Sequence, residues 1–274
     1  MMTINCNKKL IDISSPKVMG ILNVTPDSFF DGGKYKKETD ILLQLEKMLS
    51  EGATFIDVGA YSSRPGAMHI SEEVELQRIL PIVELLVQNF PEIIISVDTF
   101  RSNVAQKTIE AGAAMINDIS GGKMDAYMFE TVAKLQVPYI LMHMLGTPQN
   151  MQESPNYEDI TKEVISFFAE QLFKLHQLKV NDVLIDVGFG FGKTIEHNYE
   201  LLKNLSLFKN LDAPILVGIS RKSMLYKPLE ITPHLALNAT TSANTIALLN
   251  GANILRVHDV KEAMEAIKIV EQLS

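Results

Sequence analysis

Eight short apolar segments recur along the chain, and stretches with helical periodicity separate them. Their runs of Val, Ile and Leu are typical of strands buried on both faces of a parallel sheet. They span residues 18–24, 55–59, 93–98, 115–119, 139–144, 183–187, 215–220 and 254–258. Between these segments, the apolar residues of 38–51 fall on one face of a helix. The apolar residues of 72–88 and of 157–178 also follow this helical spacing. A strand and helix unit repeated eight times predicts an α/β fold, a closed (β/α)8 TIM barrel.

An open doubly wound sheet is the main alternative fold. It would require a Gly-rich phosphate turn after an early strand, and no GxGxxG follows residues 18–24. The glycines of residues 188–193 lack the eight-residue spacing of a Walker loop. We therefore expect a barrel that forms a single domain over residues 1–274.

The first residues of the chain predict a small addition to the barrel. Residues 3–15, with Asn5, Asn7 and Lys8 at a turn, predict an N-terminal β-hairpin that closes the bottom of the barrel.

Composition excludes several classes of partner. The 25 basic and 33 acidic residues give a net charge of -8, which argues against a nucleic-acid partner or an anionic membrane surface. Cys6 is the only cysteine, so an internal disulfide is excluded. No apolar run reaches the roughly 18 residues of a membrane span. We expect a cytoplasmic protein whose ligands are small molecules.

Polar residues collect at the C-terminal ends of the predicted strands, where the active sites of such barrels lie. They are Asn23, Asp57, Asp98, Asn117, His143, Asp186, Ser220, Arg256 and His258. The two carboxylates of Asp98 and Asp186 and the amide of Asn117 suit a flat heterocycle rich in N–H donors. The alternative, an acid and base pair of a glycosidase, fits the amide and the nearby basic residues less well.

Basic residues follow the seventh and eighth predicted strands, where such barrels frequently hold phosphate. Lys222, Arg256 and His258, with a helix start near Ser223, predict a local anion site in an acidic chain. A solvated basic turn is the alternative interpretation.

Two loops carry more side-chain chemistry than a connection requires. Residues 23–31, after the first strand, hold an Asn, a Thr, two Asp and two Phe. Residues 59–67, after the second strand, combine glycines and a proline with Arg64, which could pair with Asp31 or meet a leaving group.

These segments, from Val18 to Val270 and in the same order, resemble the motifs of dihydropteroate synthases. The resemblance implies condensation of 6-hydroxymethyl-7,8-dihydropterin diphosphate with 4-aminobenzoate, which releases diphosphate and 7,8-dihydropteroate. In the family, cleavage of the carbon–oxygen bond is thought to run ahead of attack by the amine. The resemblance also implies Mg²⁺ as cofactor and a homodimer.

The resemblance implies a role for individual residues. The implied pterin contacts are Asp98, Asn117, Asp186, Lys222, Met142 and Phe191. The implied diphosphate contacts are Asn23, Ser63, Arg64, Arg256 and His258, with Asn23 also a ligand of Mg²⁺. The implied aminobenzoate contacts are Phe30, Pro65 and Ser223, and the implied catalytic residues are Asp31, Arg64 and Lys222.

The sequence departs from the family pattern at a few positions. Tyr61 replaces the usual acidic residue, Ser63 stands where threonine is common, and Leu145 and Gln149 also differ. Two alternatives stay open, the first because of these departures and the second because it shares the barrel and the pterin carboxylates. One is a non-catalytic pterin-binding paralogue, and the other is a pterin-dependent methyltransferase domain, which would not need a diphosphate site.

Overall fold

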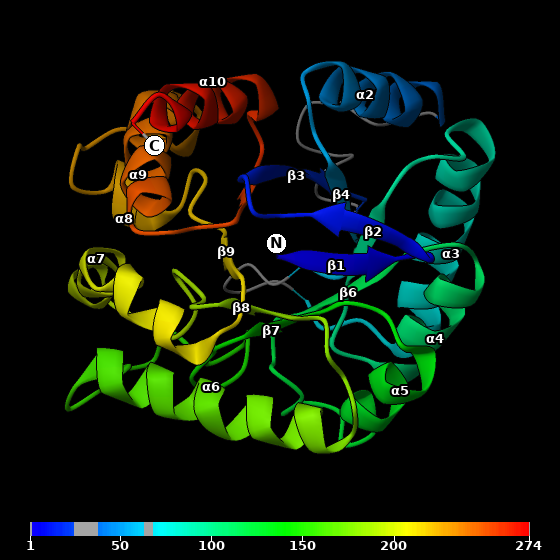
Figure 1. The fold of residues 1–274 in the computed structure, drawn as a ribbon, viewed down its shortest axis with the longest axis horizontal. Helices are drawn as coiled ribbons and strands as arrows, with labels where there is room; N and C mark the ends of the chain where they lie inside the picture. The colour runs from blue at the N-terminus through cyan, green and yellow to red at the C-terminus, as the bar shows by residue number, and fades with distance from the viewer. Residues whose placement is uncertain (1, 25–37, 63–67, 274) are drawn as a thin grey trace.

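The computed structural model describes residues 2–24, 38–62 and 68–273. It confirms the predicted barrel, in which eight parallel strands close on themselves when β10 pairs with β3. The strands are β3 (Lys17–Asn23), β4 (Phe55–Gly59), β5 (Ile95–Asp98), β6 (Met115–Asp118), β7 (Tyr139–Met142), β8 (Val183–Asp186), β9 (Ile215–Val217) and β10 (Ile254–Val257). Figure 1 shows the strands at the centre of the molecule and the helices around them.

The helices surround the barrel and connect its strands. They are α2 (Glu38–Ser50), α3 (Glu72–Asn89), α4 (Ser102–Glu110), α5 (Met128–Leu135), α6 (Ile160–Gln177), α7 (Ile195–Lys203), α8 (Ser223–Tyr226), α9 (Leu237–Leu249) and α10 (Val260–Glu271), with 3-10 turns at Leu205–Leu211 and Pro233–Leu235. Helix α2 buries Ile41, Leu45 and Met48, the face that its periodicity predicts. Helix α3 begins after Ser71, whose side chain accepts a hydrogen bond from the Val74 amide.

Side chains inside the barrel form layers, because every second residue of a strand points inward. The lower layer is apolar and consists of Met19, Phe55, Met115, Ile140, Leu184, Leu216 and Ile254. Two residues further along these strands stand Ile21, Asp57, Asn117, Met142, Asp186, Gly218 and Arg256. The interior therefore changes from apolar to polar toward the C-terminal ends of the strands.

The N-terminal hairpin closes the bottom of this barrel, as predicted. Strands β1 (Thr3–Cys6) and β2 (Lys9–Asp12) pair in antiparallel fashion. Ile4, Cys6 and Ile13 pack against the lower apolar layer, and Figure 1 shows the hairpin lying across the end of the barrel. Asn7 and Lys8 form the turn with positive φ angles of 50° and 66°. The prediction that placed Asn5 in the turn is wrong, since Asn5 lies in β1 opposite Leu10.

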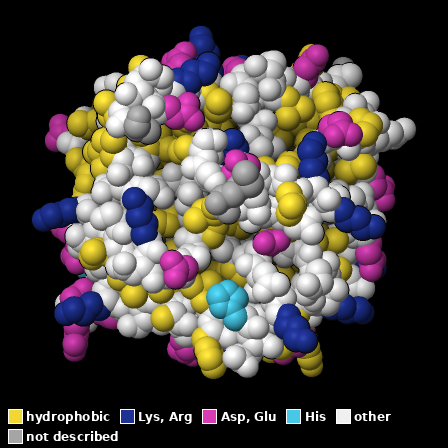
Figure 2. Space-filling view, viewed as in Figure 1, with side chains coloured by type: hydrophobic (Ala, Val, Ile, Leu, Met, Phe, Trp, Pro, Cys, Tyr) yellow, Lys and Arg dark blue, Asp and Glu magenta, His cyan; other side chains and the backbone are white. Residues whose placement is uncertain are grey.

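The face that carries the hairpin has a mixed surface. Figure 2 shows basic and acidic side chains interspersed among hydrophobic ones, without a broad patch of one sign on this face. Among residues 2–24, 38–62 and 68–273, no helix is both long and apolar enough to cross a membrane.

Candidate active site

Arg256 on β10 joins two carboxylates at the C-terminal end of the barrel. Its Nε donates to Oδ2 of Asp57 at 2.6 Å, and its Nη2 donates to Oδ2 of Asp98 at 3.2 Å. The amide of Asn117 donates to the same oxygen of Asp57 at 3.0 Å. Strands β4, β5, β6 and β10 thus place one guanidinium, two carboxylates and one amide within hydrogen-bonding reach of one another.

Burial controls the charge of this cluster. It raises the pKa of Asp98 to about 7, the neighbouring charge of Asp57 adds to the rise, and Arg256 opposes it. Asp57 is fully buried, and its Oδ1 has no hydrogen-bond partner in the described structure. A buried carboxylate oxygen without a donor is costly, so Oδ1 of Asp57 reduces the stability that the cluster gains from its hydrogen bonds.

Asp186 and Lys222 form the opposite side of the site. Asp186 is buried at the end of β8, and its Oδ1 accepts a hydrogen bond from the Gly188 amide at 2.8 Å. Burial lowers the pKa of Lys222 to about 8 despite the attraction of Asp186. The Lys222 ammonium donates to the carbonyl of Phe189 and lies 4.7 Å from the ring centroid of Phe191.

Two glycines leave space between these groups. A Cβ at Gly59 would lie 3.3 Å from Cβ of Asp98. A Cβ at Gly218 would lie 3.6 Å from Oδ2 of Asp186 and 3.9 Å from Cδ of Arg256. The absence of a side chain at both positions keeps the polar groups accessible from the mouth of the barrel.

The basic segments after β9 and β10 are ordered by contacts with each other. Arg221 forms two hydrogen bonds with Asp259, at 2.9 and 2.6 Å, so this guanidinium links the two segments. The Ser220 hydroxyl lies 3.0 Å from Nδ1 of the His258 ring. The Arg221 guanidinium is therefore occupied by a carboxylate, and Ser223 begins the four-residue helix α8.

Met142 and Phe191 lie in an apolar cluster at the same end of the barrel. The buried members are Tyr61, Phe100, Ile119, Met142, Met144 and Met151. Phe191 is partly buried against them. An apolar surface next to the carboxylates and the amide is the environment that a planar ring requires.

Sequence reasoning named His143 among the polar strand ends but missed its buried partner, Lys193. The Lys193 ammonium lies 3.0 Å from Nδ1 of His143 and donates to the carbonyls of His143 and Phe191 at 3.2 and 3.0 Å. Burial lowers the pKa of Lys193 well below its usual range, and burial next to Lys193 lowers the pKa of His143 to about 2. Three acceptors around one ammonium hold the segments after β7 and β8 together.

The structure brings together a large part of the predicted site. Asp98, Asn117, Asp186, Lys222 and Arg256 converge at the mouth of the barrel, and Asn23 ends β3 at the same level. Asp57 was one of the polar strand ends, but its central position in the cluster was not predicted. The predicted residues Phe30, Asp31, Ser63, Arg64 and Pro65 lie outside the described residues.

Asn23 is the residue to test for a metal. No group of three or more His, Cys, Asp or Glu side chains in the described part of the chain could hold a metal ion. Mg²⁺ does not need such a group, because it usually takes one or two protein oxygens and completes its shell with water and substrate phosphates. Asn23 is half-buried and has the inward position of β3, opposite Gly59. Its amide oxygen therefore fits this donor set.

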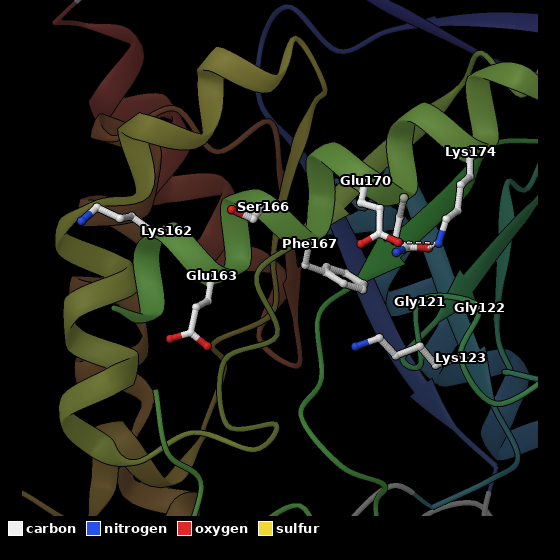
Figure 3. A pocket seen from close by; sticks show the side chains of 10 residues that line it. Gly121, Gly122, Lys123, Lys162, Glu163, Ser166, Phe167, Glu170 and Lys174 are labelled. Atoms are coloured by element: carbon white, nitrogen blue, oxygen red, sulfur yellow. Dashed lines mark hydrogen bonds and ion pairs between the residues drawn. The ribbon is translucent and has the colours of Figure 1, made fainter. Parts of the chain in front are cut away.

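A separate surface hollow lies along α6, and none of its lining residues belongs to the carboxylate cluster. Figure 3 shows Lys123 below Phe167, with Glu170 and Lys174 further along the helix. The Lys123 ammonium is 4.4 Å from the ring centroid of Phe167, and Lys174 pairs with Glu170 at 2.6 Å. The cations already have partners, so the hollow is not a candidate anion site.

The fold and the site define an α/β-barrel enzyme whose mouth can hold a flat ring with several N–H donors. The chain belongs to the pterin binding enzyme family, whose sequence profile matches residues 19–258. It is 46% identical to the dihydropteroate synthase of Escherichia coli strain K12 over 263 residues, which are 95% of this chain and 93% of that protein.

Solved structures agree with this assignment. The crystal structure of the Yersinia pestis dihydropteroate synthase with a sulfonamide drug has a TM-score of 0.94 and 44% identity, with 99% of each chain covered. The dihydropteroate synthase from Xanthomonas albilineans in complex with 7,8-dihydropteroate has a TM-score of 0.88 and 33% identity, covering 99% of this chain and 98% of that one.

Proposed function

We propose that the chain is a transferase of folate biosynthesis that condenses 6-hydroxymethyl-7,8-dihydropterin diphosphate with 4-aminobenzoate. The products are 7,8-dihydropteroate and diphosphate. The observation that carries the proposal is the cluster of Asp57, Asp98, Asn117 and Arg256 on inward positions of four strands. The dihydropteroate synthases that resemble the chain over nearly its whole length support the same reaction.

The pterin binds among the strand ends. Asp98 and Asp186 are carboxylates that can accept paired N–H bonds from an aminopyrimidine edge, and Asn117 offers both a donor and an acceptor. The amide of Asn117 already donates to Asp57, which fixes its orientation. Met142 and Phe191 provide the apolar surface against which the ring packs.

The reaction breaks the bond between the pterin methylene carbon and the diphosphate oxygen, whose electron pair leaves with diphosphate. The amine of 4-aminobenzoate then forms a bond with the methylene carbon and loses a proton. The carboxylates of Asp98 and Asp186 stabilise the positive charge that develops on the pterin. The protein therefore needs no nucleophile of its own.

The leaving diphosphate requires positive charge and hydrogen-bond donors. Arg256 uses Nε and Nη2 for the carboxylates, and a guanidinium has five N–H donors, so donors remain for a phosphate oxygen. Lys222 follows β9, and His258 follows the neighbouring strand β10. Asn23 would hold Mg²⁺, and the ion, when bound, would neutralise charge on the leaving diphosphate.

The remaining roles are part of the same proposal. Ser223 would meet the aminobenzoate carboxylate from the start of α8. Roles in binding or catalysis for Phe30, Asp31, Ser63, Arg64 and Pro65 remain predictions from the resemblance.

The protein is further proposed to be a homodimer in the cytoplasm, with residues 1–274 as one domain. Helix α9 supports the homodimer, because it leaves the apolar side chains of Ile246 and Leu249 exposed. Sedimentation of the wild-type protein and of Ile246→Lys tests this part, and a wild-type monomer would contradict it.

Diphosphate release tests the reaction. We expect release from the pterin diphosphate only when both 4-aminobenzoate and Mg²⁺ are present. Asn23→Ala should weaken release, and titration should show that it requires a higher Mg²⁺ concentration. Pterin binding without any release would favour the non-catalytic paralogue. Binding of pterin without any affinity for diphosphate would favour the methyltransferase domain.

A further inference from the structure

A fully buried carboxylate on the outside of the barrel reaches the end of β5. Glu75 lies on α3, and its Oε1 accepts a hydrogen bond from the Thr99 hydroxyl at 2.7 Å. Successive side chains of an extended segment point to opposite sides, so Asp98 points into the barrel and Thr99 points outward to α3. Glu75 therefore holds the residue that directly follows a proposed pterin contact.

Thr99 connects two of the proposed pterin contacts. It follows Asp98 in the chain, and its backbone amide donates to the carbonyl of Asn117 at 3.0 Å. Its hydroxyl also accepts a hydrogen bond from the backbone amide of Arg101 at 3.2 Å. Both the backbone and the side chain of Thr99 are thus fixed where β5 and β6 end.

The Asp98 carboxylate has little support of its own. Among the described residues, one hydrogen bond reaches it, from Nη2 of Arg256 at 3.2 Å. Burial and the neighbouring charge of Asp57 raise the pKa of Asp98 to about 7, so both oppose the ionised form. The position of this carboxylate therefore depends on the backbone that carries it, which continues into Thr99.

Glu75 stands where an apolar residue would pack at a lower cost. The other buried residues of α3 follow at helical spacing and are Ile79, Val83 and Leu86. Burial raises the pKa of Glu75, and the Thr99 hydroxyl and the Arg101 guanidinium oppose this rise. Because a buried ion pair is often no more stabilising than apolar residues of the same volume, stability alone does not explain a carboxylate at this position.

Arg101 completes the contact and extends it to neighbouring loops. Its Nη1 donates to Oε2 of Glu75, and its Nη2 donates to the carbonyl of Ile70 at 2.5 Å. Its guanidinium lies 5.6 Å from the ring centroid of Tyr61. The Tyr61 hydroxyl accepts a hydrogen bond from the Gln149 amide at 2.8 Å, so two of the departures from the family pattern are in contact. Both carboxylate oxygens of Glu75 are thus occupied by donors that the segment after β5 supplies.

We propose that Glu75 and Thr99 are positioning residues for pterin binding, an inference that rests on the proposed function. They act through Asp98 and Asn117. Arg256 pairs with the Asp98 carboxylate inside the barrel, and Glu75 fixes the following residue from outside it. A carboxylate that accepts paired N–H bonds has to be held closely, and contacts behind it supply this restraint.

The first test removes the Thr99 hydroxyl and then restores it. Calorimetry measures the dissociation constant of the pterin alcohol, 6-hydroxymethyl-7,8-dihydropterin. Thr99→Val keeps the shape of the side chain, and we expect the dissociation constant to rise about 3- to 10-fold, the effect of one hydrogen bond. Thr99→Ser keeps the hydroxyl and should bind within about twofold of the wild type.

Thr108→Val is the matched control. Thr108 is as buried as Thr99, and its hydroxyl donates to the carbonyls of Val104 and Ala105 within α4. This variant also loses a buried hydroxyl, but its contacts do not lead to the pterin site, so pterin affinity should stay within about twofold.

A second test asks whether Glu75 and Thr99 act together. Glu75→Met keeps the volume of the side chain but removes both acceptors, so it should weaken pterin binding at least as much as Thr99→Val. The double variant should bind no more weakly than Glu75→Met alone, because both substitutions remove the same contact. Thr99→Val and Thr99→Ser decide the question if Glu75→Met does not fold.

The outcomes separate the two proposals. Unchanged affinity in Thr99→Val, equal losses in Thr99→Val and Thr99→Ser, or an equal loss in Thr108→Val would overturn the positioning role. Additive losses in the double variant would also contradict it. A folded wild-type protein that does not bind the pterin alcohol would overturn the proposed function itself.

Discussion

Arg256 and Asp57 are 199 residues apart in the chain, and Nε of one lies 2.6 Å from Oδ2 of the other. They meet because β10 closes the barrel against β3, the neighbour of β4. Asp98 and Asn117 contact the same pair of residues from β5 and β6. The polar cluster therefore exists only when the barrel is closed. A ligand of this cluster can bind only to the fully folded barrel.

Asp57→Asn should destabilise the protein. The substitution keeps the shape but removes one of the two carboxylates that face the Arg256 guanidinium. Because Asp98 remains, we expect a loss of about 3 kcal/mol in the free energy of unfolding, the lower end for a broken buried pair. Urea denaturation measures it. Asp212→Asn, at an exposed position with a φ of 51°, is the matched control and should be nearly neutral. Equal stability of the two variants would show that Asp57 is not needed to neutralise Arg256.

Pterin affinity should depend on pH through Asp98. Its pKa is raised from 3.8 to about 7, chiefly by burial. Only the ionised carboxylate accepts paired N–H bonds, so affinity should rise as pH increases through about 7 and level off above it. Calorimetry with the pterin alcohol, which lacks the titrating phosphates, measures this directly. Asp98→Asn should bind weakly at every pH, and Asp57→Asn should move the midpoint to lower pH because the repelling charge is gone.

The same titration has a consequence for stability. Between pH 3.8 and about 7 the folded protein holds a proton on Asp98 that the unfolded chain has lost. The contribution of Asp98 to the free energy of unfolding therefore falls as pH rises through this interval and is constant above it. Asp98→Asn should remove this part of the pH dependence in urea denaturation. An unchanged slope would contradict the raised pKa.

Lys193→Met should destabilise the protein although it removes a buried charge. The variant leaves the carbonyls of His143 and Phe191 without their donor. Each unsatisfied buried carbonyl costs about 1 to 3 kcal/mol, so we expect a loss of about 2 kcal/mol or more in urea denaturation. Lys134→Met, on the exposed face of α5, is the control. A more stable Lys193→Met protein would mean that burial of the ammonium costs more than its hydrogen bonds return.

The sequence predicts the barrel well because each strand is a short apolar run with clear turn residues on both sides. Its least accurate details are at the ends of elements. The predicted strand 215–220 ends at Val217, since the glycine at 218 and the left-handed Arg221 begin the loop. Asn5 was assigned to a turn by residue type alone, whereas pairing with Leu10 places it in a strand.

The polar strand ends could also be predicted, since alternation along a strand decides which side chains face inward. The hydrogen-bond and ion-pair partners of these side chains could not be predicted. The cations Arg221 and Lys222 look equivalent in the sequence, but Arg221 is held by Asp259 while Lys222 faces Asp186. Such partners come from other strands, and their atomic distances depend on the register of the closed barrel. Tyr61 and Gln149 likewise show their relationship only in three dimensions.

Alanine at two glycines of the site should affect stability to very different extents. Gly188 has a φ of 68°, and a Cβ there would overlap the carbonyl oxygen of His143. Gly188→Ala should therefore lose more than about 3 kcal/mol of stability or fail to fold. At Gly218 the nearest atom to a new Cβ is Oδ2 of Asp186 at 3.6 Å, an ordinary contact. Gly218→Ala should keep its stability within about 0.5 kcal/mol.

Ligand binding then tests whether the pterin ring occupies the space next to Gly218. The added methyl group would lie between Asp186 and Arg256, where we propose that the pterin binds. Pterin affinity measured by calorimetry should fall about tenfold, which corresponds to about 1.4 kcal/mol. Because this variant is expected to fold normally, the loss reports on the pocket alone. Full affinity in a stable Gly218→Ala protein would mean that the ring does not occupy the space between these two residues.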